Sequence, residues 1–117
     1  MSYVDGFVVA VPKQKLEAYK AMARTAGAVW KEHGALAYVE CLADDVPYGE
    51  RTSFPRAVQA TEDEVVVFSW VVYPSRAARD ATMAKVMADP RLDHDPATMP
   101  FDGKRLIHGG FEAFLEL

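Results

Sequence analysis

The stretch "VVVFSWVVYP", residues 65–74, decides the fold of this chain. It is an almost unbroken run of β-branched and aromatic residues, and a run of this length and branching is typical of a strand that is covered on both faces. Such a strand belongs in the interior of a sheet. A half-solvated antiparallel sheet would not require apolar side chains on both sides of a strand. The run therefore predicts that each face of the sheet has a cover.

Other segments show the periods of strands and helices. Alternation with a period of two predicts strands at 3–11, 35–43 and 105–117, the last containing Gly109 and Gly110 at a bulge or tight bend. Apolar residues spaced by three and four predict a helix over 16–34, and Ser75 caps a second helix over 76–88. The segment "RAVQA" (56–60) could add a short strand, and 89–103, with three prolines, reads as a long irregular loop.

The order of these elements predicts an α+β fold. Two strand–helix–strand units place four principal strands in a ferredoxin-like antiparallel sheet with both helices on one face. We find no repeats or linkers, so residues 1–117 are expected to form one domain. The second face also needs a cover, because burial of apolar surface contributes ~25 cal/mol per Å². The sheet of a second copy would supply it, which predicts a homodimer with an isologous interface.

Composition narrows the classes of partner. The chain has 13 Lys and Arg residues against 17 Asp and Glu residues, and its net charge of −4 disfavours nucleic acid. No segment reaches the length of a membrane span, and the first residues lack the features of a secretory signal. The single Cys41 cannot make an internal disulfide, which favours a reducing compartment. We expect a cytoplasmic protein without nucleic-acid or membrane partners.

Three residues could carry acid–base chemistry. Imidazole titrates closest to neutral pH, so His108 is a candidate for proton transfer, and Asp5 would orient it if the last strand lies beside the first. The register between these strands decides whether the two side chains share a face. Glu40, within a predicted strand, lies either on a wet face or in a pocket that raises its pKa. The alternative for His108 is a structural or solvent-facing role.

Aromatic side chains are candidates for binding a substrate. Trp70, Tyr38 and Phe7 could line an apolar pocket between the sheet and the helices, and the alternative for each is core packing. The neighbours of Cys41 indicate a small buried side chain rather than a reactive thiolate. His94 lies in an acidic loop, but its spacing matches no metal motif. There is no phosphate-binding loop, paired-cysteine motif or nucleophile elbow, so we predict no cofactor and no metal.

Several blocks of sequence extend over essentially the whole chain: "YVDGFVVAVP", "GAL" followed by "VEC", "DDVPYG", "VVFSW", "YPS", "DPR" and "MPFDGKRLIHGGFE". These blocks resemble the uncharacterised bacterial YbaA-like family. The resemblance implies a dimeric α/β barrel in which two ferredoxin-like subunits pack sheet against sheet. That superfamily includes cofactor-independent monooxygenases, lactone isomerases, haem enzymes and many members without a known reaction, and the YbaA-like branch belongs with the last group.

Two hypotheses for the function remain open. The first is a cofactor-independent, monooxygenase- or isomerase-like enzyme that moves a proton on a small metabolite in a pocket between sheet and helices. The second is a noncatalytic dimeric module that binds a small ligand or a protein. Ligand-induced stabilisation followed by turnover favours the enzyme, and stabilisation without turnover favours the module.

Overall fold

The computed structural model describes all residues from Met1 to Leu117 and contains one antiparallel sheet. Its strands lie in the order β2-β3-β1-β4, which confirms the interior position predicted for the hydrophobic run in β3. The α+β class is likewise confirmed. The strands are β1 (Tyr3–Pro12), β2 (Ala37–Leu42), β3 (Glu64–Tyr73) and β4 (Ile107–Glu112).

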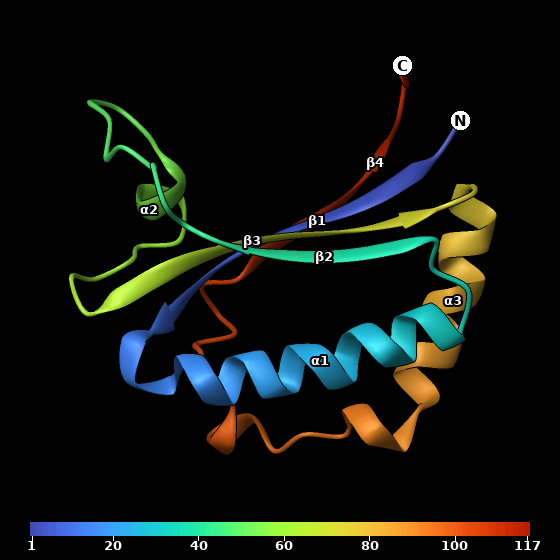
Figure 1. The fold of residues 1–117 in the computed structure, drawn as a ribbon, viewed down its shortest axis with the longest axis horizontal. Coiled ribbons are helices and arrows are strands. Elements are labelled where there is room, and N and C mark those ends of the chain that lie inside the picture. The colour runs from blue at the N-terminus through green and yellow to red at the C-terminus, as the bar shows by residue number, and fades with distance from the viewer.

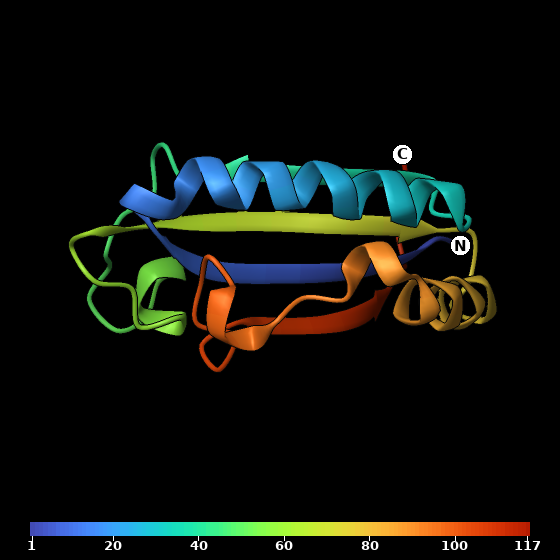
Figure 2. The same ribbon diagram turned by 90° about the horizontal axis from the view of Figure 1, so that it is seen from below.

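The two long helices lie on one side of the sheet but cover it unequally. The long helix α1 (Leu16–Glu32) runs below the sheet, whereas α3 (Arg76–Ala88) stands at one end and reaches below it (Figure 1). Seen from below, the chain between α3 and β4 crosses the region of β1 and β4 beside α1 (Figure 2). This connection contains two short 3-10 turns, Pro90–Leu92 and Pro96–Thr98, and it provides the cover that a second full-length helix would otherwise give.

The sheet has two chemically different faces. The helix face carries buried residues of two core clusters, one with Val9, Val11 and Val67 around Tyr19 of α1 and the other with Tyr3 and Tyr73. We call the opposite surface the outer face and define it by the strand register and the alternation of side chains. Away from the end where Ala10 and Val66 lie, its members are Val4, Gly6, Val8, Ala37, Val39, Cys41, Phe68, Trp70, Val72, Ile107, Gly109 and Phe111.

The outer face is covered at one end only. Val58 packs there against Val8, Ala10 and Val66. Over the rest, a hollow of about 640 Å³ is lined mainly by apolar side chains, including Trp70. Phe68 and Phe111 are 38% and 63% exposed, so large apolar side chains face water in the single chain.

The predicted strand at 56–60 is wrong. Residues Phe54–Ala57 form the short helix α2, because the Ser53 hydroxyl accepts a hydrogen bond from the Arg56 backbone N–H at 3.1 Å and Pro55 suits a first helical turn. Hydroxyl capping of a single turn leaves no period in the sequence, so alternation alone could not detect it. The segment nevertheless reaches the outer face through Val58.

The last strand differs from its prediction in length and regularity. It ends at Glu112, opposite Tyr3, the first residue of β1, and only one further backbone hydrogen bond follows, from the Ala113 N–H to the Ser2 carbonyl at 2.9 Å. Its register with β1 is continuous through Gly109 and Gly110, so there is no bulge. A side chain at Gly110 would collide with the Tyr3 hydroxyl and the Arg79 guanidinium. Glycine at this position therefore makes room for side chains that cross the strand.

Candidate functional site

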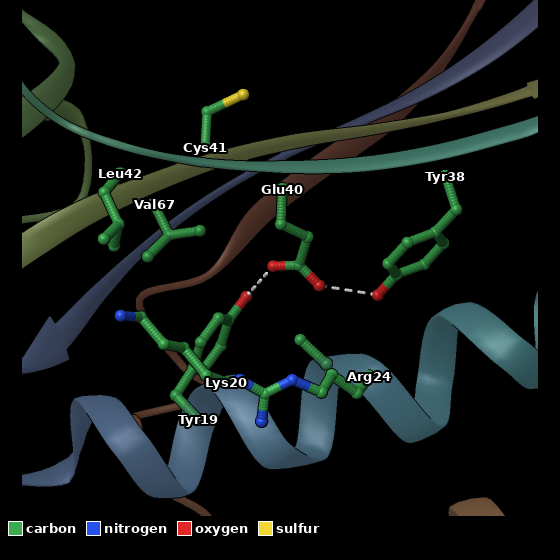
Figure 3. Close-up of a pocket in the computed structure, with 9 residues that line it drawn as sticks. Tyr19, Lys20, Arg24, Tyr38, Glu40, Cys41, Leu42 and Val67 are labelled. Atoms are coloured by element: carbon green, nitrogen blue, oxygen red, sulfur yellow. Dashed lines mark hydrogen bonds between the residues drawn. The ribbon is translucent and has the colours of Figure 1, made fainter.

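A cavity of about 450 Å³ opens between β2 and α1, within the usual size range of small-molecule sites. Figure 3 shows Glu40 pointing from β2 toward α1, whereas the neighbouring Cys41 points to the other side of the strand. This follows from the alternation of a strand, because Glu40 pairs with Ser69 and Cys41 with Phe68. Lys20 and Arg24 of α1 also line the cavity.

The carboxylate of Glu40 is held by two phenols. The Tyr19 hydroxyl donates to Oε1 at 2.5 Å, and the Tyr38 hydroxyl donates to Oε2 at 2.6 Å (Figure 3). These distances are in the range of charge-assisted O–H···O⁻ hydrogen bonds. A carboxylate has about four lone-pair sites, so each oxygen keeps an unused one for a proton.

Local sequence places both phenols. Tyr19 lies on the buried stripe of α1 and packs edge-on against Phe101, with ring centroids 5.8 Å apart. Tyr38 lies two residues before Glu40 on the same face of β2. Its ring passes close to Gly27, where a Cβ would stand 2.9 Å from the ring, so glycine inside α1 gives Tyr38 the room it needs.

The environment keeps both phenols protonated. Burial is the main cause that raises the pKa of Tyr19 and of Tyr38 far above the ordinary tyrosine value of 10.0, and the hydrogen bond to the Glu40 carboxylate adds to it. The two side chains therefore act as hydrogen-bond donors across the physiological pH range.

A second cavity, of about 240 Å³, adjoins the first and is almost wholly apolar. It lies between the sheet, α1 and the connection from α3 to β4, and Phe7, Trp30, Met22 and Phe101 are among its lining residues. Both cavities are bordered by Tyr19, Ala23, Tyr38 and Glu40. The carboxylate thus lies at the junction of a cavity that Lys20 and Arg24 also line and a second cavity that is almost wholly apolar.

The register between β1 and β4 shows whether Asp5 and His108 lie on the same face of the sheet. Asp5 lies opposite Gly110 and His108 opposite Phe7, so the two candidates share the helix face. They do not form a hydrogen-bonded pair. The buried Asp5 carboxylate instead accepts two hydrogen bonds from Nε of Arg79, each 3.1 Å long, and the exposed His108 ring stacks on Phe7 with a centroid distance of 6.1 Å.

The aromatic candidates are divided between the faces. Tyr38 and Phe7 line the apolar cavity on the helix side, with Tyr38 bordering the larger hollow as well. Trp70 does not line the space between sheet and helices, because its position in β3 places it on the outer face, against Phe68 at a ring-centroid distance of 5.5 Å. Alternation along β3 places Trp70 and Tyr73 on opposite faces of the sheet, but it does not indicate which of these faces the helices cover.

The acidic loop has a different partner from the one its sequence suggests. Asp89 accepts hydrogen bonds from His33 Nε2 at 2.9 Å and from the Arg91 guanidinium, which also pairs with Glu32. No three His, Cys, Asp or Glu side chains converge as a metal site. His94 instead lines the apolar cavity.

Sequence reasoning missed three contributors to the site. Tyr19 reads as a core residue of the helical stripe, and only its contact with Glu40 reveals a polar role. Lys20 and Arg24 read as solvated helix residues. The available signal was the spacing of Lys20 and Arg24, because residues four positions apart are neighbours on one face of a helix.

Comparison with known proteins agrees with this architecture. The model of a family described as "Protein of unknown function (DUF1428)" matches residues 2–103. The uncharacterized protein YbaA of Escherichia coli strain K12 is 56% identical over 116 residues, covering 99% of both chains, and so is that of Shigella flexneri. The chain belongs to this family. The resemblance to YbaA-like proteins found in the sequence is thereby confirmed, and these relatives are themselves uncharacterised.

A solved structure supports the fold of this DUF1428 member. It is described as a dimeric ferredoxin-like protein from an uncultured marine organism, and it aligns with a TM-score of 0.62 over 99% of this chain and 98% of its own. The two sequences are only 10% identical, so the likeness concerns the fold alone. None of the helices here is both long enough and apolar enough to cross a membrane.

Proposed function

We propose that the protein is a cofactor-independent, isomerase-like enzyme that moves a proton on a small and largely apolar metabolite. Glu40 is the base. The observation that carries the proposal is a carboxylate at the junction of two cavities, with both oxygens fixed by the phenols Tyr19 and Tyr38. A general base must be held in place within reach of its proton, and this arrangement meets that requirement.

The reaction class follows from the groups present. Glu40 takes a proton from a carbon beside a carbonyl group, and the electrons of the C–H bond move to the carbonyl oxygen to give an enolate. Once Glu40 holds the proton, a phenol O–H that had donated to it turns to donate a hydrogen bond to that oxygen, as in other sites where charge develops on oxygen. Glu40 then returns the proton to the same carbon or to another carbon of the conjugated system. The step consumes no oxidant and no cofactor.

We further propose that two copies pack outer face against outer face as a dimeric α/β barrel. The twelve positions of the outer face carry no charged side chain, and large side chains such as Phe111 are exposed there in the single chain. The dimeric state printed for the ferredoxin-like neighbour is consistent with this. Because Glu40 faces α1, its cavity would lie on the far side of the sheet from the partner.

Deuterium exchange tests the chemical step without knowledge of the substrate. A panel of small ketones, enones and lactones is incubated with the protein in D₂O, and loss of C–H signals is followed by NMR. We expect exchange with the wild type and a fall of about 10²- to 10⁴-fold with Glu40→Gln, the usual contribution of a general base. Glu112→Gln is the matched control, because Glu112 is exposed on β4 and has no side-chain partner.

Equal exchange by Glu40→Gln and the wild type would refute the assignment of the base. Binding of panel members without any exchange would instead favour the noncatalytic ligand-binding module.

A further inference from the structure

Two cations line the larger cavity beside Glu40. Lys20 and Arg24 lie four residues apart on α1, so their side chains are neighbours on one face of the helix. Figure 3 shows both side chains on the helix that faces the carboxylate. The cavity thus has a basic wall on α1 and the Tyr19–Glu40–Tyr38 group at its inner end.

The guanidinium of Arg24 has no partner in the chain. The other arginines in helices are engaged: Arg56 donates to backbone carbonyls, Arg76 pairs with Asp80, and Arg79 pairs with Asp5. Lys20 reaches only Glu17, at 3.7 Å, and that carboxylate is 85% exposed. Like charges four residues apart repel one another, so the pair weakens the isolated helix unless an anion joins it.

The inner carboxylate does not neutralise these cations. Both oxygens of Glu40 already accept hydrogen bonds from phenols, and no ion pair joins Glu40 to Lys20 or Arg24. A planar guanidinium binds a carboxylate through two parallel N–H···O bonds, and a lysine beside it adds a second positive charge. The vacant donors therefore match a carboxylate.

We propose that the ligand of this cavity is a small organic acid whose carboxylate binds Lys20 and Arg24 and which also carries the carbonyl group that the proton transfer needs. The inference rests on the proposed function in that it names the substrate class of the same site. The apolar body of the acid extends past Glu40 into the cavity lined by Phe7 and Trp30. The carbon that exchanges its proton then lies near the carboxylate of Glu40, between the charged group and the apolar body.

Matched acids and amides test the charge requirement. Phenylacetate, cinnamate and hydrocinnamate are compared with their primary amides by thermal shift and calorimetric titration against the wild-type protein. We expect each acid to bind at least about tenfold more tightly than its amide, because hydrogen bonds to a charged group are stronger than those to a neutral one. The double variant Lys20→Gln/Arg24→Gln should remove this difference, while Lys15→Gln/Lys85→Gln, which removes two exposed charges elsewhere, should keep it.

The outcomes separate this inference from the proposed function. Glu40→Gln should still bind the acids, because the basic pair is intact. Acid binding without proton exchange would refute the enzyme and leave the anion site standing. Equal binding of acids and amides, loss of selectivity in the Lys15/Lys85 variant, or no binding of any acid would overturn the inference, even if neutral ketones undergo exchange.

Discussion

The helix face and the outer face of the sheet differ in whether their side chains find partners within the same chain. On the helix face, the buried Asp5 and the half-buried Glu40 have partners within the same chain, Asp5 in Arg79 and Glu40 in its two phenols. Away from the end covered by Val58, the outer face has no charged side chain, and much of its apolar surface has no cover. Internal pairing suits a face that holds a site, whereas an uncovered apolar face suits assembly.

The largest effect is expected from a charge in the outer face. Trp70→Glu places a carboxylate in the middle of the proposed interface, where a desolvated charge without a partner costs about 2–5 kcal/mol. We expect the dissociation constant of the dimer to rise by about a thousandfold. Sedimentation at micromolar concentration should show a dimer for the wild type and a monomer with unchanged helix content for the variant.

Ala84→Glu provides the control for this change. Ala84 is exposed on α3, so the added charge stays in water and the protein should sediment like the wild type. If Trp70→Glu remains a dimer, the outer face is not the interface.

The second largest effect is expected when the ion pair between Asp5 and Arg79 on the helix face is broken. Asp5→Asn removes one partner of a largely buried ion pair, and the free energy of unfolding should fall by about 3 kcal/mol. Urea denaturation measures the change. Asp80→Asn removes an exposed partner of the same Arg79, and its effect should stay below about 1 kcal/mol.

A contrary result would change the role of Asp5. Stability unchanged in Asp5→Asn, together with loss of proton exchange, would return this carboxylate to the catalytic role for which it was a sequence candidate.

Periodicity predicted the strands, the helices and the sharing of faces within each strand. It could not predict α2, because a capped single turn is specified by Ser53 and Pro55 rather than by a repeat. It also overextended β4, because alternation continues to Leu117 while the neighbouring β1 begins at Tyr3. A strand ends where its partner ends, and that information lies far away in the sequence.

The site was only partly predictable for a related reason. Glu40 and Tyr38 were candidates, and the structure brings them together because they are two residues apart on one strand. Tyr19 was not, since a phenol on an apolar helical stripe is indistinguishable from core until its partner is known. The suggested pair of Asp5 and His108 failed to form because Arg79, distant in sequence, competes for the carboxylate.

The third effect is a loss of stability in acid. Two hydrogen bonds from Arg105, of 2.8 and 2.7 Å, lower the pKa of Glu64 from 4.5 to about 2. The lowered value in the folded state means that the stabilisation is present above pH 4.5 and is lost as the pH falls toward 2. Glu64→Gln should lower the free energy of unfolding by about 2 kcal/mol at neutral pH.

The same variant should approach the wild type at the acid end, where Glu64 is itself protonated. Chemical denaturation across this pH range measures the convergence. A constant difference at all pH values would mean that packing, not charge, is what the substitution removes.

The smallest effect on stability is expected at the site itself. Tyr19→Phe removes one hydroxyl and leaves Glu40 bonded to Tyr38, so the free energy of unfolding should fall by only about 1 kcal/mol. The protein should stay folded, so this loss of stability alone would not slow proton exchange. Exchange should nevertheless slow, because one carboxylate oxygen is no longer fixed and one hydrogen-bond donor to the enolate oxygen is removed. Thr82→Val, which removes the hydrogen bond from the buried Thr82 hydroxyl to the His33 backbone carbonyl on the helix side of the sheet and away from both cavities, is the comparison. If both variants lose the same stability but only Tyr19→Phe loses exchange, the polar groups of the helix face divide into those that hold the fold and those that serve the cavity.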